Sequence, residues 1–269
     1  MTSYESINAL NWSTLKNLAK SPLEYQWRLS HPEPRKISYI LGSAIHCLVL
    51  EPEKFNKRYA LCEMKRDKRT MAYKAWLEDN GRLEPLTADE WDTAHLSAEA
   101  VRAHPVAKRI LEPCRCEEPL QWIDPITGLS CKGRVDAISP TYIVDLKSTV
   151  DPSPRKFTRD AATYLYHGQI SFYETGARAT RNIAPTGDSF EPSAYIIAAG
   201  KLPPYDVAVY FLSPYELDVG RNLCLSLMRK LEECIASDIW PGSAPDLLQL
   251  ELPRYAQGMD LEPEQQEAW

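Results

Sequence analysis

Two short apolar segments joined by a turn constrain this chain more than any other feature. Residues 133–138 read GRVDAI, residues 143–149 read IVDLKST, and the turn residues SPT at 139–141 lie between them. Apolar and β-branched residues on both sides of a Ser-Pro turn predict two short strands. Each predicted strand then carries one aspartate, Asp136 in the first and Asp145 in the second.

Asp145 and Lys147 point to the same side of the second strand, because residues i and i+2 share a face, whereas Leu146 points into the core. Two carboxylates and an ammonium group suit metal-dependent phosphodiester cleavage, since hard divalent cations take oxygen ligands and a nearby ammonium orients water or offsets developing charge. An exposed Asp–Lys pair is commonly only solvated surface. Here the lysine closes an apolar strand, which favours a catalytic site at Asp136, Asp145 and Lys147.

Other elements are predicted on both sides of these strands. Glu118, Leu120 and Trp122 indicate a preceding strand that ends in a turn at 124–128. Glu117 or Glu118 could approach a metal from that strand, although a carboxylate on the strand face is the commoner outcome. Ser13 is the predicted cap of a first helix and Ser21 the cap of a second. Later segments predict helices at 40–50, 71–80, 88–103, 160–177 and 214–237, and strands at 194–199 and 207–212.

Two of these helices carry polar residues among apolar ones. His46 lies in the middle of an apolar helix, and the residues alone favour a core histidine satisfied by one hydrogen bond. Tyr166, Gln169 and Tyr173 share one helix face at i, i+3 and i+7. Aromatic residues at that spacing are usually core, but the polar Gln169 indicates a face turned toward the site.

The motifs together resemble a known family. A G-R-x-D motif is followed by D-x-K nine residues after its aspartate, and then by Gln169-x-x-x-Tyr173 on a helix. This pattern resembles the PD-(D/E)xK nuclease superfamily, and within it the RecE-type exonucleases (exonuclease VIII) of phages and prophages, relatives of lambda exonuclease and of the RecB nuclease domain. Residues 41–52 resemble the histidine-bearing helix of that family. The similarity extends from about Ser13 to about Trp240.

The resemblance implies an α/β fold with a restriction-endonuclease-like core, in which helices flank a central mixed sheet beneath an N-terminal helical lobe. We expect one nuclease domain over 1–269, with the helical lobe at 1–112, the nuclease core at 113–240 and a C-terminal arm and tail at 241–269. His46, Asp136, Asp145 and the carbonyl of Leu146 would hold Mg²⁺, with Mn²⁺ as the alternative. Lys147 would position the attacking water, and Gln169 and Tyr173 would lie near the active centre.

The charge distribution limits where nucleic acid can bind. The net charge of −6 argues against a broad basic surface, although a local groove is compatible with it. A basic run at 54–69 could contact phosphates, or could be a solvated face. The expected DNA contacts are Lys65, Arg66, Lys68, Arg69, Arg134, Ser148, Thr149, Arg155, Lys156, Arg159 and Tyr166.

The cysteines indicate the redox state of the compartment, and the hydropathy indicates whether the chain crosses a membrane. The seven cysteines are odd in number and scattered, and no signal peptide is evident, which predicts reduced thiols in a cytoplasm. The resemblance to nucleases of phages and prophages implies that this is the cytoplasm of a bacterial host cell. Some members of the superfamily hold an iron–sulfur cluster with a late group of three cysteines. This chain lacks that group, so we expect no cluster. No apolar run approaches the ~20 residues of a membrane span.

The predicted function is exonuclease digestion of linear double-stranded DNA, 5′ to 3′ by resemblance, leaving 3′ single-stranded overhangs for homologous recombination. The same resemblance implies a ring-shaped homo-oligomer acting on duplex ends and a single-strand annealing recombinase as a partner. Two alternatives stay open at this point: a structure-specific endonuclease of the same superfamily, and a catalytically silent module that binds DNA ends.

Overall fold

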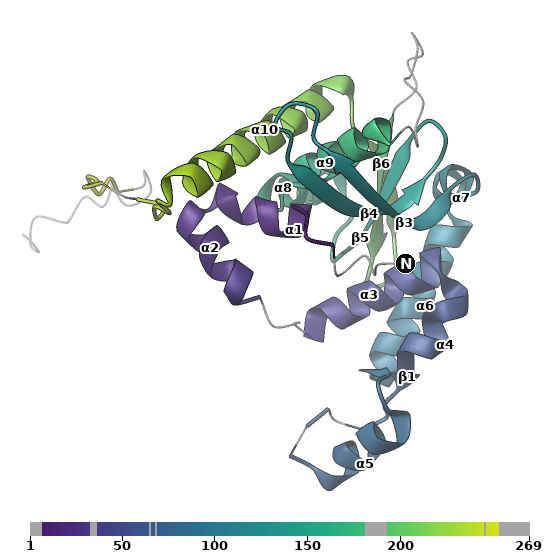
Figure 1. Cartoon of the computed structure of the whole chain (residues 1–269). Helices are drawn as coiled ribbons and strands as arrows, with labels where there is room; N and C mark the ends of the chain where they lie inside the picture. Colours follow the sequence, from purple (N-terminus) through teal and green to yellow (C-terminus); the bar gives the residue numbers. More distant parts are fainter. Residues whose placement is uncertain are drawn as a thin grey trace, which may run out of the picture.

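A mixed β-sheet forms the centre of the molecule in the computed structural model, which describes residues 7–32, 37–64, 66–67, 69–180, 193–244 and 246–252 (Figure 1). Within these ranges the central sheet has five strands in the order β3-β4-β5-β6-β7. Their bounds are β3 Arg115–Ile123, β4 Ser130–Ile138, β5 Ile143–Thr149, β6 Ala194–Gly200 and β7 Val207–Phe211. Only the β5–β6 pair is parallel, and the other neighbours in this sheet are antiparallel. The predicted mixed α/β fold is confirmed.

Side-chain hydrogen bonds fix the two hairpin turns. In the first turn, Asp124 Oδ1 accepts hydrogen bonds from the backbone N–H groups of Ile126 and Thr127. Gly128 follows with φ of +72°, a conformation that residues with a Cβ rarely adopt. In the second turn, Ser139 Oγ accepts from the N–H groups of Thr141 and Tyr142. Both turns occur where the sequence predicts them, so Asp136 and Asp145 lie on adjacent strands.

Two layers of helices bury opposite faces of the sheet (Figure 1). On one face α9 (Tyr166–Ala179) and α10 (Pro214–Ser237) pack with α1 (Trp12–Leu15) over a core that includes Val135, Ile143, Ile196 and Phe172. On the other face α3 (Ile37–Leu50), α6 (Ala88–Ala103) and α7 (Pro105–Leu111) cover Val144, Leu146 and Ile197. Successive β5 residues therefore alternate between the two cores, as a strand buried on both faces requires.

The remaining elements are short. They are the helical turns η2 (Lys16–Ala19), η3 (Pro52–Lys54) and α4 (Phe55–Arg58), the helices α2 (Pro22–Ser30), α5 (Met71–Asn80) and α8 (Pro154–Thr163), and the strands β1 (Tyr59–Leu61) and β2 (Glu84–Leu86). β1 and β2 pair in parallel as a separate small sheet. The segment that carries α5 projects away from the body of the molecule (Figure 1).

Two helix predictions are wrong in detail. Asn11, not Ser13, caps the first helix, because its Oδ1 accepts from the N–H of Thr14. The single helix predicted at 160–177 is two helices, α8 and α9, which are interrupted at Tyr164 and Leu165. Leu165 has φ of +58° and ψ of +42°, a left-handed conformation that ends one helix and redirects the next. Ser21 caps α2 as predicted, accepting from the N–H of Glu24.

Residues 240 and 241, at the boundary between the predicted nuclease core and the predicted C-terminal arm, pack against α2. The Trp240 ring stacks on Tyr25 with 6.0 Å between centroids, and the N–H of Leu23 donates to the carbonyl of Pro241 at 3.0 Å. The predicted tail from residue 253 onward lies outside the described residues. Within the described part of the chain, no helix has the length and apolarity needed to cross a membrane.

Candidate active site

Helix α3 brings His46 against the two inner strands β4 and β5 of the central sheet. Its apolar side chains, including Ala44, Ile45 and Leu48, bury the helix against α6 and β5. The imidazole of His46 hydrogen bonds with the backbone of Leu146, and its Nδ1 lies 3.7 Å from Asp136 Oδ2. The imidazole thus lies beside the Asp136 carboxylate, where a neutral histidine could share a metal ion with it.

Asp136 links the two central strands. Its Oδ2 accepts a hydrogen bond of 2.8 Å from the N–H of Leu146 on β5. This bond fixes the carboxylate of β4 against the backbone of the D-x-K segment. Two residues that are ten positions apart in the sequence therefore meet at one point of the sheet.

Glu117 completes a group of three possible ligands. One ligand atom from each of His46, Glu117 and Asp136 lies within 4.8 Å of the other two. The β3–β4 ladder pairs Cys116 with Ala137 and Glu118 with Val135, so Glu117 lies opposite Asp136. Its φ of +54° departs from strand geometry at this point, and strained backbone of this kind is frequent at functional sites.

The sequence-based preference for a plain strand-face carboxylate fits Glu118 but not Glu117. Glu118 pairs with Arg115 on the same strand at 3.2 Å. Counting outward from the predicted turn at 124–128 pairs residue 123 with residue 129 and so places residue 117 opposite residue 135, whereas the observed ladder pairs Ile123 with Ser130. Neither this one-residue difference in register nor the positive φ of Glu117 could be predicted from the sequence.

A second polar group lies beside the first. Lys147 Nζ is 2.5 Å from Asp145 Oδ2, and Gln169 Nε2 on α9 donates to Asp145 Oδ1 at 3.1 Å. The ring of Tyr166 lies beneath the ammonium group, with its centroid 4.9 Å from Nζ. Asp145 is only 2% exposed, so its charge depends on these partners. Lys147 is thereby held between the Asp145 carboxylate and the Tyr166 ring.

The carboxyl groups of the site are crowded and buried. Burial raises the pKa of Asp136, although Lys147 and the N–H of Leu146 oppose the shift. Burial and the neighbouring Asp136 raise the pKa of Glu117 to about 7, and burial raises the pKa of Asp145 to about 6. Burial and the charge of Lys147 lower the pKa of His46 to about 4, which leaves the imidazole neutral and able to ligate. A divalent cation would relieve the repulsion among these carboxylates.

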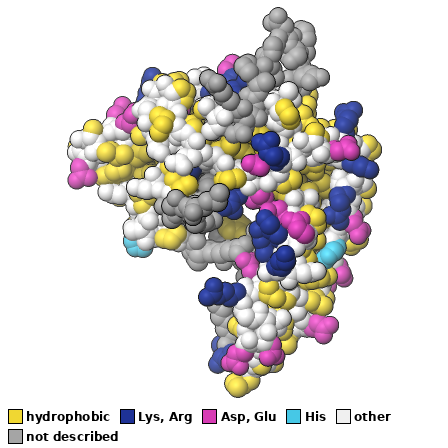
Figure 2. Space-filling model, turned by 45° about the vertical axis from the view of Figure 1, so that its right-hand side comes forward, with side chains coloured by type: hydrophobic (Ala, Val, Ile, Leu, Met, Phe, Trp, Pro, Cys, Tyr) yellow, Lys and Arg dark blue, Asp and Glu magenta, His cyan; other side chains and the backbone are white. Residues whose placement is uncertain are grey.

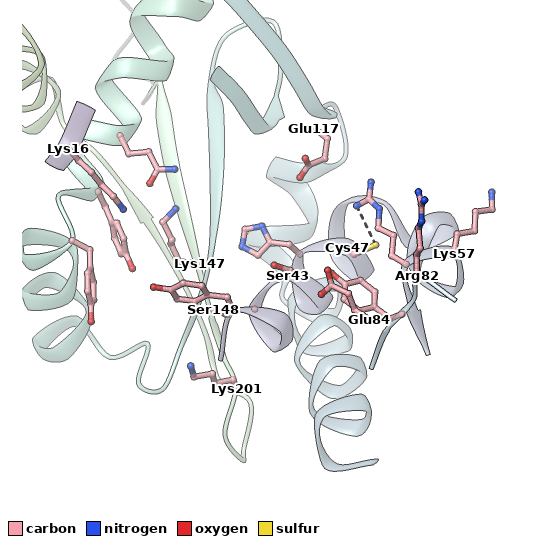
Figure 3. A pocket seen from close by; sticks show the side chains of 18 residues that line it. Lys16, Ser43, Cys47, Lys57, Arg82, Glu84, Glu117, Lys147, Ser148 and Lys201 are labelled. Atoms are coloured by element: carbon pink, nitrogen blue, oxygen red, sulfur yellow. Dashed lines mark hydrogen bonds between the residues drawn. The ribbon is translucent and has the colours of Figure 1, made fainter. Parts of the chain in front are cut away.

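An open cleft of about 1100 Å³ leads to these residues. In Figure 3 Lys16 and Lys147 lie on one side of the view, Lys57 and Arg82 on the other, and Ser43 and Glu117 between them. Figure 2 shows Lys and Arg side chains beside carboxylates near the middle of one face. The charged residues that line the cleft are Lys16, Lys57, Arg58, Arg82, Lys147, Lys201, Glu84 and Glu117. Basic residues outnumber acidic ones on these walls despite the net negative charge of the chain.

Of the other residues expected to act in the site or to contact DNA, three lie close to it. Ser148 and Tyr166 line the cleft. Arg134 on β4 is near enough to Glu117 to lower the pKa of that carboxyl group. Thr149 is instead buried, and its Oγ1 donates to the carbonyl of Asp151. Tyr173 packs against the core and Gly133, where a Cβ would meet its ring at 2.8 Å.

The predicted basic contacts on other segments do not line the cleft. Arg155, Lys156 and Arg159 are exposed on α8. Arg66 pairs with Glu90 at 2.6 Å, and Arg69 pairs with Asp67 at 2.8 Å. Lys65 and Lys68 lie outside the described residues. The cleft draws its cations from other positions, including Lys57 and Arg58 of the predicted basic run.

The sequence was compared with known protein families. Residues 11–247 match the family model described as a PDDEXK-like domain of unknown function, DUF3799. The chain belongs to the DUF3799 family of PDDEXK-like domains. The predicted resemblance to the PD-(D/E)xK superfamily is confirmed, whereas the RecE-type assignment within it stays a prediction. Membership supports a nuclease, and nucleases of this kind usually use divalent metals.

Solved structures add information on the fold. A protein from Eubacterium rectale, whose crystal structure is described as that of a "Putative exonuclease", aligns over 97% of this chain and 99% of its own. The TM-score is 0.61 at 12% identity, which supports a shared fold. The structure of SSO0001 covers 86% of this chain and 96% of its own at 14% identity, but its TM-score of 0.29 does not establish a common fold. Among curated proteins, none matches this DUF3799 chain.

Proposed function

We propose that this protein is a metal-dependent exonuclease that digests linear double-stranded DNA 5′ to 3′ and leaves 3′ single-stranded overhangs for homologous recombination. The observation that carries the proposal is the convergence of His46, Glu117 and Asp136 beside the Asp145–Lys147 pair, at the base of a basic cleft. The resemblance to RecE-type exonucleases and the fold shared with the Eubacterium rectale protein favour exonuclease over endonuclease action.

The donor set fits Mg²⁺ or Mn²⁺. Two carboxylates, one neutral imidazole and the carbonyl of Leu146 suit a hard or borderline divalent cation better than Zn²⁺, since no cysteine belongs to the group of possible ligands among the described residues. Asp145 lies next to this group and would supply a further oxygen. A bound metal would polarise the scissile phosphate and lower the pKa of a water molecule.

Lys147 would orient the attacking water. Its ammonium group is fixed by Asp145 and by the Tyr166 ring, so little reorganisation is needed during the reaction. Gln169 holds Asp145 through its amide and so acts as a positioning residue. Lys16, Lys57, Arg58, Arg82 and Lys201 would bind the phosphate backbone along the cleft.

End dependence is the first test of this function. Linear duplex DNA carrying a label at either the 5′ or the 3′ end is incubated with Mg²⁺ or with EDTA, next to a covalently closed circle. We expect the linear DNA to shorten from its 5′ ends only with Mg²⁺, and the circle to stay intact. Nicking of the circle would assign a structure-specific endonuclease instead, and binding without cleavage of either DNA would assign a silent end-binding module.

The proposed partners follow from the same resemblance. A ring-shaped homo-oligomer would enclose the duplex and retain it through successive cleavage steps, and a single-strand annealing recombinase would receive the overhang. Light scattering coupled to size-exclusion chromatography measures the oligomeric state directly. A monomer at micromolar concentration, with and without duplex DNA, would contradict the ring.

A further inference from the structure

The break between α8 and α9 places an aromatic side chain on the wall of the cleft. Tyr164 is the C-terminal cap of α8, and Leu165 follows in the left-handed conformation with φ of +58°. This conformation is unfavourable for a bulky residue with a Cβ and persists only where the surrounding structure holds it. Its consequence here is that Tyr164 leaves the helix and lines the same cleft as Lys147.

Tyr164 and Tyr166 form a stacked pair. Their ring centroids are 5.8 Å apart with 27° between the planes. Tyr166 also contacts Phe157 at 6.0 Å and lies beneath the ammonium group of Lys147. Tyr166 is therefore anchored in the core and in the site, and Tyr164 lies one ring farther out along the same cleft.

The exposure of Tyr164 distinguishes it from a packing residue. The residue is 58% exposed although one face of its ring is stacked. Single exposed aromatic residues are common and need no explanation on an open surface. Tyr164 instead lies in a cleft that also contains Lys16, Lys147 and Lys201. A cationic groove with an accessible aromatic ring is the combination by which proteins bind unpaired nucleotides.

We propose that Tyr164 is a stacking platform for one unpaired base of the DNA strand that is cut. The proposal rests on the proposed nuclease function and adds that the cleft takes a nucleotide out of the duplex. With the scissile phosphate near Lys147, the base of a neighbouring nucleotide would lie against the exposed ring of Tyr164. Purines offer the larger π surface, so a purine at that position would bind more tightly than a pyrimidine.

Stacking is measured directly with single-stranded oligonucleotides that carry 2-aminopurine at successive positions. Binding is followed by anisotropy and by 2-aminopurine fluorescence with Ca²⁺ in place of Mg²⁺, after a gel shows that the strand stays intact. For wild type we expect quenching of 2-aminopurine at one position. Tyr164→Phe should retain that quenching. Tyr164→Ala and Tyr164→Leu should lose it and bind about tenfold more weakly.

Two controls test whether the effect of the Tyr164 variants comes from stacking of the base. Tyr215→Ala removes another exposed tyrosine, 72% exposed at the start of α10, and should change neither signal. A strand with an abasic nucleotide at the quenched position should bind wild type and Tyr164→Leu with equal affinity. Without a base at that position, the Tyr164 ring has nothing to stack on. Thermal unfolding measurements check that each variant is folded. If Tyr164→Ala does not fold, the comparison is made with Tyr164→Leu alone.

Two results would contradict the proposed stacking of a base on Tyr164. One is quenching that persists in Tyr164→Leu. Another is an equal loss of affinity for the abasic and the intact strand. The nuclease function is tested separately by wild-type cleavage of linear duplex with Mg²⁺. If wild type cleaves DNA and Tyr164→Leu still quenches 2-aminopurine, the stacking role of Tyr164 is wrong and the nuclease function stands. If wild type does not cleave DNA, the nuclease function is wrong.

Discussion

Gly42 of α3 and Ser148 of β5 approach so closely that a Cβ on the glycine would lie 2.9 Å from Ser148 Oγ. Real Cβ atoms essentially never come so near another heavy atom, so any larger residue at position 42 forces a shift. His46 lies one helical turn beyond Gly42 on the same helix, and α3 makes its contact with β5 through this stretch. We therefore expect Gly42 to allow the close approach of α3 to β5 that brings His46 beside Asp136.

Gly42→Ala should weaken metal binding without unfolding the protein. Alanine favours the helix by about 1 kcal/mol over glycine, but it displaces Ser148 or the helix. We expect a loss of about tenfold in affinity for Mn²⁺, measured by titration calorimetry, because ligand geometry tolerates little displacement. Adding Ser148→Ala to Gly42→Ala removes the obstructing hydroxyl and should restore most of the affinity. No restoration would show that the contact does not govern His46.

Lys147→Ala should abolish cleavage and preserve the fold. The ammonium group contacts Asp145 and the Tyr166 ring beside the cleft, so its loss acts on the reaction. We expect the rate on linear duplex DNA to fall by about 10³-fold or more, and the variant to stay folded at a lower melting temperature, because the buried Asp145 loses its charged partner. Lys230→Ala, which changes an exposed lysine on α10, is the matched control. Cleavage by Lys147→Ala at the parent rate would remove this residue from the mechanism.

Glu117→Gln should reduce metal affinity by at least about tenfold, because it removes one of the converging carboxylates. Its neighbour Glu118 pairs with Arg115 and lies outside the group of possible ligands. Glu118→Gln therefore tests the same chemical change one residue away and should bind metal as wild type does. Equal affinities for the two variants in calorimetry would contradict the assignment of Glu117.

Metal affinity should depend on pH between about 6 and 8. The pKa of Glu117 is raised to about 7 and that of Asp145 to about 6, so both bind protons in this range and a metal must displace them. His46, with its pKa lowered to about 4, stays neutral throughout. We expect affinity to fall about tenfold from pH 8 to pH 6. In Glu117→Gln the dependence should be much flatter, and an unchanged slope in that variant would count against this account.

The raised pKa of Glu117 also predicts that the free energy of unfolding of the metal-free protein depends on pH. Because the folded pKa of Glu117 lies above its ordinary value of 4.5, its protonation stabilises the fold below pH 4.5, and this contribution is lost as pH rises through 7. Glu117→Gln should therefore stabilise the protein at pH 8 by about 1 kcal/mol, a figure reduced for the partial exposure of the side chain. The gain should vanish near pH 4. Urea unfolding in EDTA at both pH values measures it.

Local patterns in the sequence predicted much of the fold. The two turns, the strands that carry Asp136 and Asp145, and the long helix from Pro214 are encoded by residues close together in the chain. Turn chemistry and hydrophobic periodicity act over a few residues, so they can be interpreted without knowing the rest of the molecule. The residues alone predicted that His46 is a core residue, and only the resemblance to the superfamily predicted that it is a metal ligand.

Only the tertiary structure decided the rest. The left-handed Leu165 is a bulky residue in a conformation that its type does not favour, so its place in the chain gave no sign of the break that presents Tyr164. Glu117 joins His46 and Asp136 because strand pairing and a strained φ bring it there. Likewise, the cations of the cleft come from segments far apart in the sequence, and their proximity depends on packing between helices and sheet rather than on any local pattern.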